Sequence, residues 1–239
     1  MKTLSLGLLL TLAAFAQAAD PAPAKPAETV NVAPKAKAKT KAPDPAMAPI
    51  QDVAGLPRIL LIGDSISIGY TLPVRKQLEG KANVHRITIN GGPTANGVAN
   101  LGKWLGPAKW DVIHFNFGLH DLKIMEGGKR QVEPEDYERN LRSLVAELRK
   151  TGARLIFATT TPVPEGKLNP PRNFGDVATY NRIALKVMQE NGVAIDDRNA
   201  AITPDLAKLQ KPHDVHFTAE GYAALGQAVV QSLQKELGK

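Results

Sequence analysis

The stretch RILLIGDSIS, residues 58–67, decides how the chain folds. Its first half, Arg58–Ile62, has the length and apolar character of a buried strand, and its second half begins with turn residues. A strand that runs directly into a turn and then a helix is the unit of a parallel sheet covered by helices. Because ligands bind beyond the carboxyl ends of such strands, Ser65 stands where chemistry is expected.

Further segments continue the same alternation. Apolar runs that predict strands lie at residues 84–89, 112–117, 154–159 and, in a shorter form, 193–195. Apolar positions at the spacing of one helical face predict helices at residues 134–150, 178–191 and 219–237. The alternation predicts an α/β domain over residues 56–239, and the whole length of 239 residues suits one full core better than two.

The first 55 residues have a different composition. Lys2, a short apolar run and the small residues around Gln17 predict an export signal peptide over residues 1–18. Residues 19–55 are rich in Pro, Ala and Lys, which predicts a disordered linker. We therefore expect a secreted or periplasmic bacterial protein, with no stable membrane insertion after the signal is removed.

Charge and cysteine content narrow the classes of partner. The formal net charge is +7, and five lysines of this excess lie in the linker, where no aromatic residue accompanies them to stack on bases. We expect no nucleic-acid partner, and at most a weak electrostatic contact of the linker with acidic envelope polymers. The chain has no cysteine, which excludes disulfides and thiol catalysis.

Ser65 follows the first strand in the sequence Gly63-Asp64-Ser65-Ile66-Ser67. Such a turn can present a nucleophile, cap a helix or bind a phosphate. The phosphate-loop pattern GxxxxGK[ST], the dinucleotide pattern GxGxxG and the nucleophile elbow GxSxG are all absent at this turn. The first two absences weaken the phosphate-binding interpretation, and the third argues against the α/β-hydrolase fold.

GDSIS resembles the first conserved block of the SGNH (GDSL-like) hydrolases, in which the serine is the nucleophile. The resemblance implies a three-layer α/β/α sandwich with a flavodoxin-like parallel sheet of about five strands in the order 2-1-3-4-5. It also implies a serine esterase with no cofactor. Three further blocks of that family have counterparts in the same order along residues 57–238.

Two of these blocks supply the predicted oxyanion hole. Gly92, or Gly97 as an alternative, is similar to the family's glycine, whose backbone amide would join that of Ser65. Gly118-Leu119-His120-Asp121 matches the third block, except that His120 replaces an asparagine. A neutral imidazole still has one N–H to donate to the oxyanion.

The last block supplies the predicted base. His216 matches the family's catalytic histidine, and the usual acid three residues earlier is replaced by His213. Asp214, two residues before the base, would lie on the same side of an extended loop and could orient it. If it does not, His216 would rely on a backbone carbonyl and act with Ser65 as a dyad.

The resemblance implies hydrolysis of esters through an acyl-enzyme. With few aromatic residues and no long apolar insertion, short acyl groups such as acetyl on a carbohydrate are the expected substrates. A lipase-like acylhydrolase and a catalytically silent domain that binds acylated polymers remain alternatives, as does a zinc site at His213, Asp214 and His216. The proline-rich loop 161–176 would shape the pocket, with Arg172 and Asn173 as candidate sugar contacts.

Overall fold

The computed structural model describes residues 44–238. Its five parallel strands form one sheet in the order β2-β1-β3-β4-β5, which confirms the predicted strand order. The strands are β1 (Arg58–Ile62), β2 (Asn83–Arg86), β3 (Val112–Phe115), β4 (Arg154–Ala158) and β5 (Ala194–Asp196). The predicted signal peptide and residues 19–43 of the predicted linker lie outside the described residues.

Three strands end earlier than their apolar runs, β4 by a single residue at Ala158 and β2 and β3 by more. The run at 84–89 predicted a longer second strand, but the last backbone bond of its ladder is the one from Ile87 N to Leu61 O at 3.1 Å. The third strand likewise stops at Phe115, and Asn116 N donates to Ile62 O at 3.0 Å. Both segments leave the sheet where β1, the neighbour that they share, ends at Ile62.

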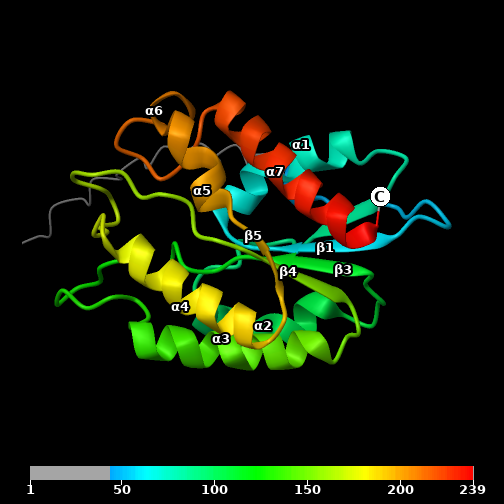
Figure 1. Cartoon of the computed structure of the whole chain (residues 1–239), viewed down its shortest axis with the longest axis horizontal. Helices are drawn as coiled ribbons and strands as arrows, with labels where there is room; N and C mark the ends of the chain where they lie inside the picture. Colours follow the sequence, from blue (N-terminus) through cyan, green and yellow to red (C-terminus); the bar gives the residue numbers. More distant parts are fainter. Residues whose placement is uncertain (1–43, 239) are drawn as a thin grey trace, which may run out of the picture. The chain divides into compact units, whose positions relative to one another are not determined.

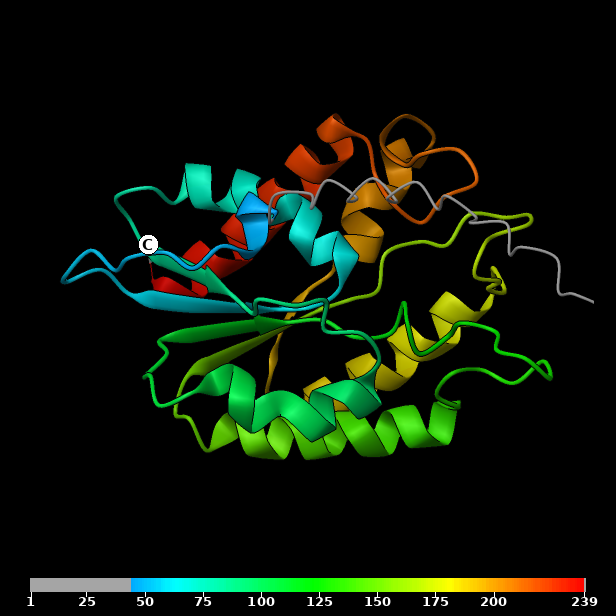
Figure 2. The same ribbon diagram turned by 180° about the vertical axis from the view of Figure 1, so that it is seen from behind.

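Helices cover both faces of the sheet (Figures 1 and 2). On one side lie α1 (Ser65–Gln77), α5 (Arg198–Ile202), α6 (Leu206–Leu209) and α7 (Ala219–Leu237), and on the other lie α2 (Thr94–Leu105), α3 (Pro134–Arg149) and α4 (Asp176–Glu190). Two single 3₁₀ turns, Pro45–Met47 and Thr203–Asp205, complete the described elements. The arrangement is the predicted three-layer α/β/α sandwich.

The core follows from the sequence pattern of these layers. β1 and β3 are buried on both faces, as expected of central strands in a covered parallel sheet. Helix α3 buries the predicted apolar face, whose members include Leu141, Leu144, Val145 and Leu148. The sheet is therefore a rigid platform, and its loops carry the polar groups.

The segment before β1 is part of the folded domain, which corrects one predicted boundary. Residues 44–55 were expected to be linker, but Ala46 is buried and the Arg75 guanidinium donates to the Pro45 carbonyl at 3.1 Å. Asn83 accepts from the Val53 N–H at 2.9 Å. The composition of this segment gave no sign of these contacts, because its bonds are made to side chains from other elements.

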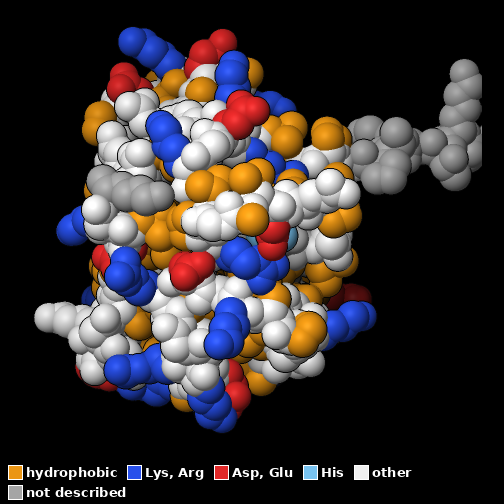
Figure 3. All heavy atoms as spheres, turned by 90° about the vertical axis from the view of Figure 1, so that its right-hand side faces the viewer, with side chains coloured by type: hydrophobic (Ala, Val, Ile, Leu, Met, Phe, Trp, Pro, Cys, Tyr) orange, Lys and Arg blue, Asp and Glu red, His pale blue; other side chains and the backbone are white. Residues whose placement is uncertain are grey.

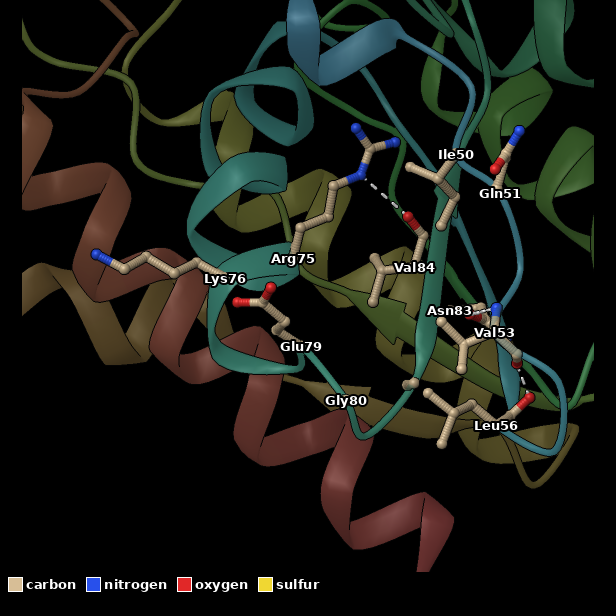
Figure 4. A pocket seen from close by; sticks show the side chains of 11 residues that line it. Ile50, Gln51, Val53, Leu56, Arg75, Lys76, Glu79, Gly80, Asn83 and Val84 are labelled. Carbon is tan, nitrogen blue, oxygen red and sulfur yellow. Dashed lines mark hydrogen bonds between the residues drawn. The ribbon is translucent and has the colours of Figure 1, made fainter.

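The same segment lines an open cavity of about 430 Å³ beside α1 and the start of β2 (Figure 4). Arg75 crosses it and donates from Nε to the Val84 carbonyl at 3.0 Å. No serine, histidine or cysteine lines this cavity. It lies at the amino end of β2, so it is remote from the carboxyl edge where catalysis is expected.

Figure 3 shows the end of the molecule at which α7 terminates, where basic, acidic and apolar side chains are interspersed. No patch of a single charge dominates this face. Among residues 44–238, no helix combines the length and apolar character that a membrane span requires.

Candidate active site

Ser65 is the first residue of α1, immediately beyond the end of β1. Asp64 caps the helix by accepting from the Ile66 N–H at 2.9 Å. The Ser65 N–H donates no hydrogen bond within the part of the chain that is described. This free amide at a helix N-terminus is suited to stabilise negative charge.

A buried arginine, Arg86, hydrogen-bonds the backbone of this turn. The Arg86 side chain, at the end of β2, donates from Nη2 to the Gly63 carbonyl at 2.9 Å and to the Asp64 carbonyl at 3.1 Å. It also bonds the Ser67 hydroxyl. Burial lowers the pKa of Arg86 to about 10, which leaves the guanidinium charged at neutral pH. Arg86 therefore fixes the backbone from which Ser65 projects.

The structure brings Ser65, His216 and Asp214 together. Ser65 Oγ lies 2.9 Å from His216 Nε2, although the two residues are 151 positions apart. His216 Nδ1 lies 2.7 Å from Asp214 Oδ1. Because a carboxylate only accepts, the proton is on Nδ1, and Nε2 is free to accept from the serine hydroxyl.

Asp214 reaches His216 through a turn, whereas an extended loop was expected. Asp214 Oδ1 also accepts from the His216 backbone N–H at 3.1 Å, which is the local i to i+2 bond of an Asx-turn. His213 just before it has a φ of 53°, in the left-handed region. Partial burial opposes ionisation of Asp214, but the hydrogen bonds from His216 outweigh it and lower the pKa of the carboxyl.

His120 lines the same cavity as Ser65, and a lysine sets its tautomer. Lys123 Nζ lies 2.9 Å from His120 Nδ1. An ammonium group only donates, so Nδ1 accepts and the ring proton is on Nε2. Burial, helped by the charges of Lys123 and Arg172, lowers the pKa of His120 to about 4. His120 is thus a neutral imidazole with one N–H to donate.

Asp121 connects the segment that contains Gly92 to the segment that contains His120. It is fully buried and accepts from the Thr94 N–H at 2.8 Å, at the N-terminus of α2, and from the Thr94 hydroxyl. Burial raises the pKa of its carboxyl to about 7. The role of this aspartate is structural: it ties the loop of His120 to the loop of Gly92.

The structure places Gly92 less favourably than the sequence suggested. Its N–H donates to Asn90 Oδ1 at 3.0 Å, and Asn90 rather than Gly92 lines the cavity. The alternative, Gly97, lies inside α2 against Phe117. The contribution of Gly92 to an oxyanion hole stays a prediction, and it requires the amide to exchange its present partner.

The cavity at Ser65 has a volume of about 290 Å³. Its other lining residues include Leu168, Pro170 and Arg172 of the proline-rich loop, which agrees with the expectation that this loop shapes the pocket; contact of Arg172 with a sugar stays a prediction. Asn173 is absent from this lining and bonds Asp176 at the start of α4. A second open groove of about 680 Å³ adjoins His216 and runs between residues 167–169 and 212–214.

The zinc alternative finds no geometric support. Among residues 44–238, no group of three or more His, Asp or Glu side chains is placed to hold a metal ion. Two of the three residues proposed for it are engaged otherwise, since His216 bonds both Ser65 and Asp214.

Comparison with known proteins identifies the family. Residues 61–224 match the GDSL-like lipase/acylhydrolase family. The chain belongs to this family. GDSL hydrolases act on carboxylic esters, which agrees with a serine, a histidine and an aspartate in bonding contact at the sheet edge. An arylesterase of Vibrio mimicus is 26% identical over 129 residues, which are 49% of this chain and 58% of that protein.

Solved structures of other esterases and acylhydrolases have the same fold. The lipase/acylhydrolase from Enterococcus faecalis superposes with a TM-score of 0.65 at 21% identity, covering 75% of this chain and 96% of that one. An acetyl xylan esterase superposes with a TM-score of 0.64 at 15% identity, covering 74% and 99%. The acetylxylan esterase from Geobacillus stearothermophilus has a TM-score of 0.60 at 20% identity, covering 77% and 94%.

Two residues at the site were not found from the sequence of this GDSL hydrolase. Lys123 carried one signal, its spacing of three from His120. Arg86 carried none, because a basic residue in an apolar strand is recognisable as a buried anchor only when the carbonyls it bonds are known.

Proposed function

We propose that the protein is a serine esterase in which Ser65 is the nucleophile, His216 the general base and Asp214 the residue that orients the base. The chain of contacts from Ser65 Oγ to His216 Nε2 at 2.9 Å, and from His216 Nδ1 to Asp214 Oδ1 at 2.7 Å, carries the proposal. Family membership supports it, because GDSL hydrolases cleave esters.

The mechanism follows from these tautomers. His216 Nε2 takes the hydroxyl proton of Ser65 while Oγ attacks the ester carbonyl. The Ser65 N–H and the His120 Nε2–H stabilise the oxyanion. The intermediate then expels the alcohol, which receives the proton from His216. Water activated by His216 attacks the acyl-enzyme, releases the acid and restores Ser65.

Lys123 acts through His120. By occupying Nδ1, the ammonium keeps the proton on Nε2, which is the nitrogen left to donate. The pKa of His120, lowered by burial to about 4, keeps the ring neutral throughout the physiological range. Histidine thereby supplies the single donor that the asparagine of related enzymes supplies.

We propose short acyl groups on a carbohydrate as the substrates. The cavity at Ser65 is small, about 290 Å³, whereas the groove beside His216 is open and about 680 Å³ in volume. His216 protonates the leaving alcohol, so the larger space lies where a bulky alcohol would leave. Acetyl xylan esterases are among the proteins with a similar fold.

We also propose that the enzyme acts outside the cytoplasm, in a bacterial periplasm or exterior. The sequence of residues 1–18 supports this proposal. Fractionation of cells that produce the full chain, followed by sequencing of its N-terminus, tests it. Recovery of the unprocessed chain in the cytoplasm would refute export.

Ser65→Ala tests the catalytic proposal. Because nucleophile and base act as a unit, we expect hydrolysis of para-nitrophenyl acetate to fall roughly 10⁴-fold or more. His216→Ala should give a comparable loss. Circular dichroism of both variants serves as the control for folding. Wild-type protein that binds an acetylated glycan but cleaves no ester would instead support the silent binding domain.

A further inference from the structure

Two positive charges lie beside each other at the catalytic cavity. Lys123 and Arg172 both line it and both are half-buried. Their backbones form an antiparallel bridge, and Ile124 N donates to the Pro171 carbonyl at 2.9 Å. The bridge joins the loop after β3 to the proline-rich loop after β4, so the backbones of both loops hold Lys123 and Arg172 in place.

Like charges directly opposite each other across a bridge repel, so this pairing costs stability unless something compensates it. Within residues 44–238, neither Lys123 nor Arg172 forms an ion pair with a carboxylate. Burial, followed by the charge of Arg172, lowers the pKa of Lys123. The pair is therefore partly desolvated and lacks a bonded counter-charge.

The carboxylates that lie near Arg172, those of Asp214 and Asp64, already accept hydrogen bonds from other groups. Asp214 lines the same cavity, but its Oδ1 accepts two hydrogen bonds from His216. Asp64 faces the helix amide of Ile66. Each lies close enough to Arg172 to act on it through space, yet neither bonds it.

The two cations retain donors for a ligand. Arg172 donates from Nε to the Leu119 carbonyl at 3.0 Å and from Nη1 to the Pro170 carbonyl at 3.1 Å. These bonds fix the plane of the guanidinium and leave Nη2 without a partner among the described residues. Lys123 uses one of its three N–H groups on His120. A carboxylate is the group that such donors recognise.

We infer that the ester substrate carries a negative charge close to its scissile bond, and that Lys123 and Arg172 bind this charge. The inference rests on the proposed esterase function and narrows its substrate to anionic esters. A carboxylate fits on either side of the bond, as an acidic sugar in the alcohol part or as a dicarboxylic acid in the acyl part. The two sources share one chemistry and are separated by experiment.

Matched pairs of esters test the inference. For the alcohol part, meta-acetoxybenzoate is compared with its neutral amide, meta-acetoxybenzamide. For the acyl part, para-nitrophenyl hemisuccinate is compared with para-nitrophenyl levulinate. In at least one pair, we expect kcat/KM for the anionic ester to exceed that for the neutral one by about tenfold at low salt. The ratio should fall as salt screens the charges.

Arg172→Gln should lower this anionic-to-neutral ratio at least about fivefold, since one of the two charges is lost. Arg182→Gln is the matched control, because Arg182 is exposed on α4 and lines no part of the cavity. It should leave the ratio unchanged. If Arg172→Gln fails to fold, Lys123→Gln tests the same ratio while keeping a neutral donor for His120.

A ratio near one in both pairs, or a ratio that Arg172→Gln and Lys123→Gln leave intact, would overturn the inference. Ser65-dependent cleavage of the neutral esters would still support the proposed function in that case. Absence of Ser65-dependent cleavage of every ester would overturn the proposed function and this inference together.

Discussion

Of the three histidine–aspartate pairs among residues 44–238, two have nearly equal N–O separations in different surroundings. His216 and Asp214 lie 2.7 Å apart at the rim of the sheet, with side chains 37% and 41% exposed. His114 on β3 and Asp196 on β5 lie 2.8 Å apart inside the domain, with side chains 0% and 5% exposed. Only the first pair has a serine hydroxyl in contact with its second ring nitrogen.

The inner pair belongs to a buried polar cluster. His114 Nδ1 has no hydrogen-bond partner, and the Tyr70 ring lies edge-on to the imidazole at 6.3 Å between centroids. The Arg198 guanidinium lies over Tyr70 and has its Nε 3.9 Å from Asp196. Burial lowers the pKa of His114 despite its aspartate. A hydrogen-bonded histidine–aspartate pair is therefore a candidate catalytic site only where it also contacts a nucleophile and is exposed to solvent.

Asp214→Asn gives the largest effect that separates the two pairs. Amide in place of carboxylate favours the wrong tautomer of His216, so kcat should fall more than tenfold and by up to roughly 10⁴-fold. Because the pair is exposed, the free energy of unfolding should change by only about 0–1 kcal/mol. Steady-state kinetics and urea unfolding measure both. An unchanged kcat would show that another group orients His216.

Asp196→Ala should show the reverse pattern. Removal of this carboxylate leaves the His114 ring and the buried Arg198 charge unpaired, and we expect a loss of about 3–5 kcal/mol in the free energy of unfolding. The kcat of the folded fraction on para-nitrophenyl acetate should stay within about twofold, which is under 0.5 kcal/mol. Urea unfolding followed by fluorescence measures the loss. An Asp196→Ala variant that is as stable as the wild type but has a strongly reduced kcat would contradict a purely structural role for the inner pair.

His120→Ala tests the donor that stands in for asparagine. Loss of one oxyanion donor should raise the barrier by about 2.7–4 kcal/mol, seen as a 10²- to 10³-fold fall in kcat. His120→Asn restores a donor and should recover part of this loss, whereas a purely structural role would predict no recovery of kcat. KM should change little in either variant, because the interaction is made in the transition state.

The smallest predicted effect is the loss of folding stability at acid pH. Burial lowers the pKa of His120 to about 4, while in the unfolded chain a histidine titrates near about 6.5. As the pH falls below that value, the unfolded chain binds a proton that the folded one resists, so stability is lost down to about pH 4. His114 has the same sign, since burial lowers its pKa as well.

Urea midpoints at pH 7.5 and pH 5 measure this effect, and His120→Asn should lose less stability between them than the wild type. Asp121 acts in the opposite sense, because burial raises its pKa to about 7 and the folded state then binds the extra proton. The difference between the two proteins is therefore the quantity to compare. Equal losses would show that His120 does not titrate as its burial implies.

Local patterns predicted a large part of the fold. The first strand, Arg58–Ile62, was predicted with its correct bounds, and the helix at 219–237 as well, because apolar spacing and a capping Thr218 mark its start. Helix α1 was foreseen only as a turn into a helix. Its Pro73 and weak apolar pattern hide its length, which packing against α7 stabilises.

In the candidate site, too, local motifs predicted some residues and only the folded structure revealed others. Ser65, His216, Asp214 and His120 were found because each stands in a short motif after a predicted strand or before a predicted helix. The reason given for Asp214 was wrong, since a turn and not an extended loop brings it to His216. Arg86 and the pairing of Lys123 with Arg172 depend on loops that meet only in space.

The sequence by itself predicted the strand order, which the structure confirms, and the proposed nucleophile and base, because these predictions depend on local spacing and on motifs that a chain carries wherever it folds. Tertiary structure decided which histidine–aspartate pair contacts a serine, which ring nitrogen of His120 keeps its proton, and where Lys123 and Arg172 meet beside Ser65. Those outcomes depend on burial and on through-space contacts between distant segments, and neither is encoded in the local order of residues.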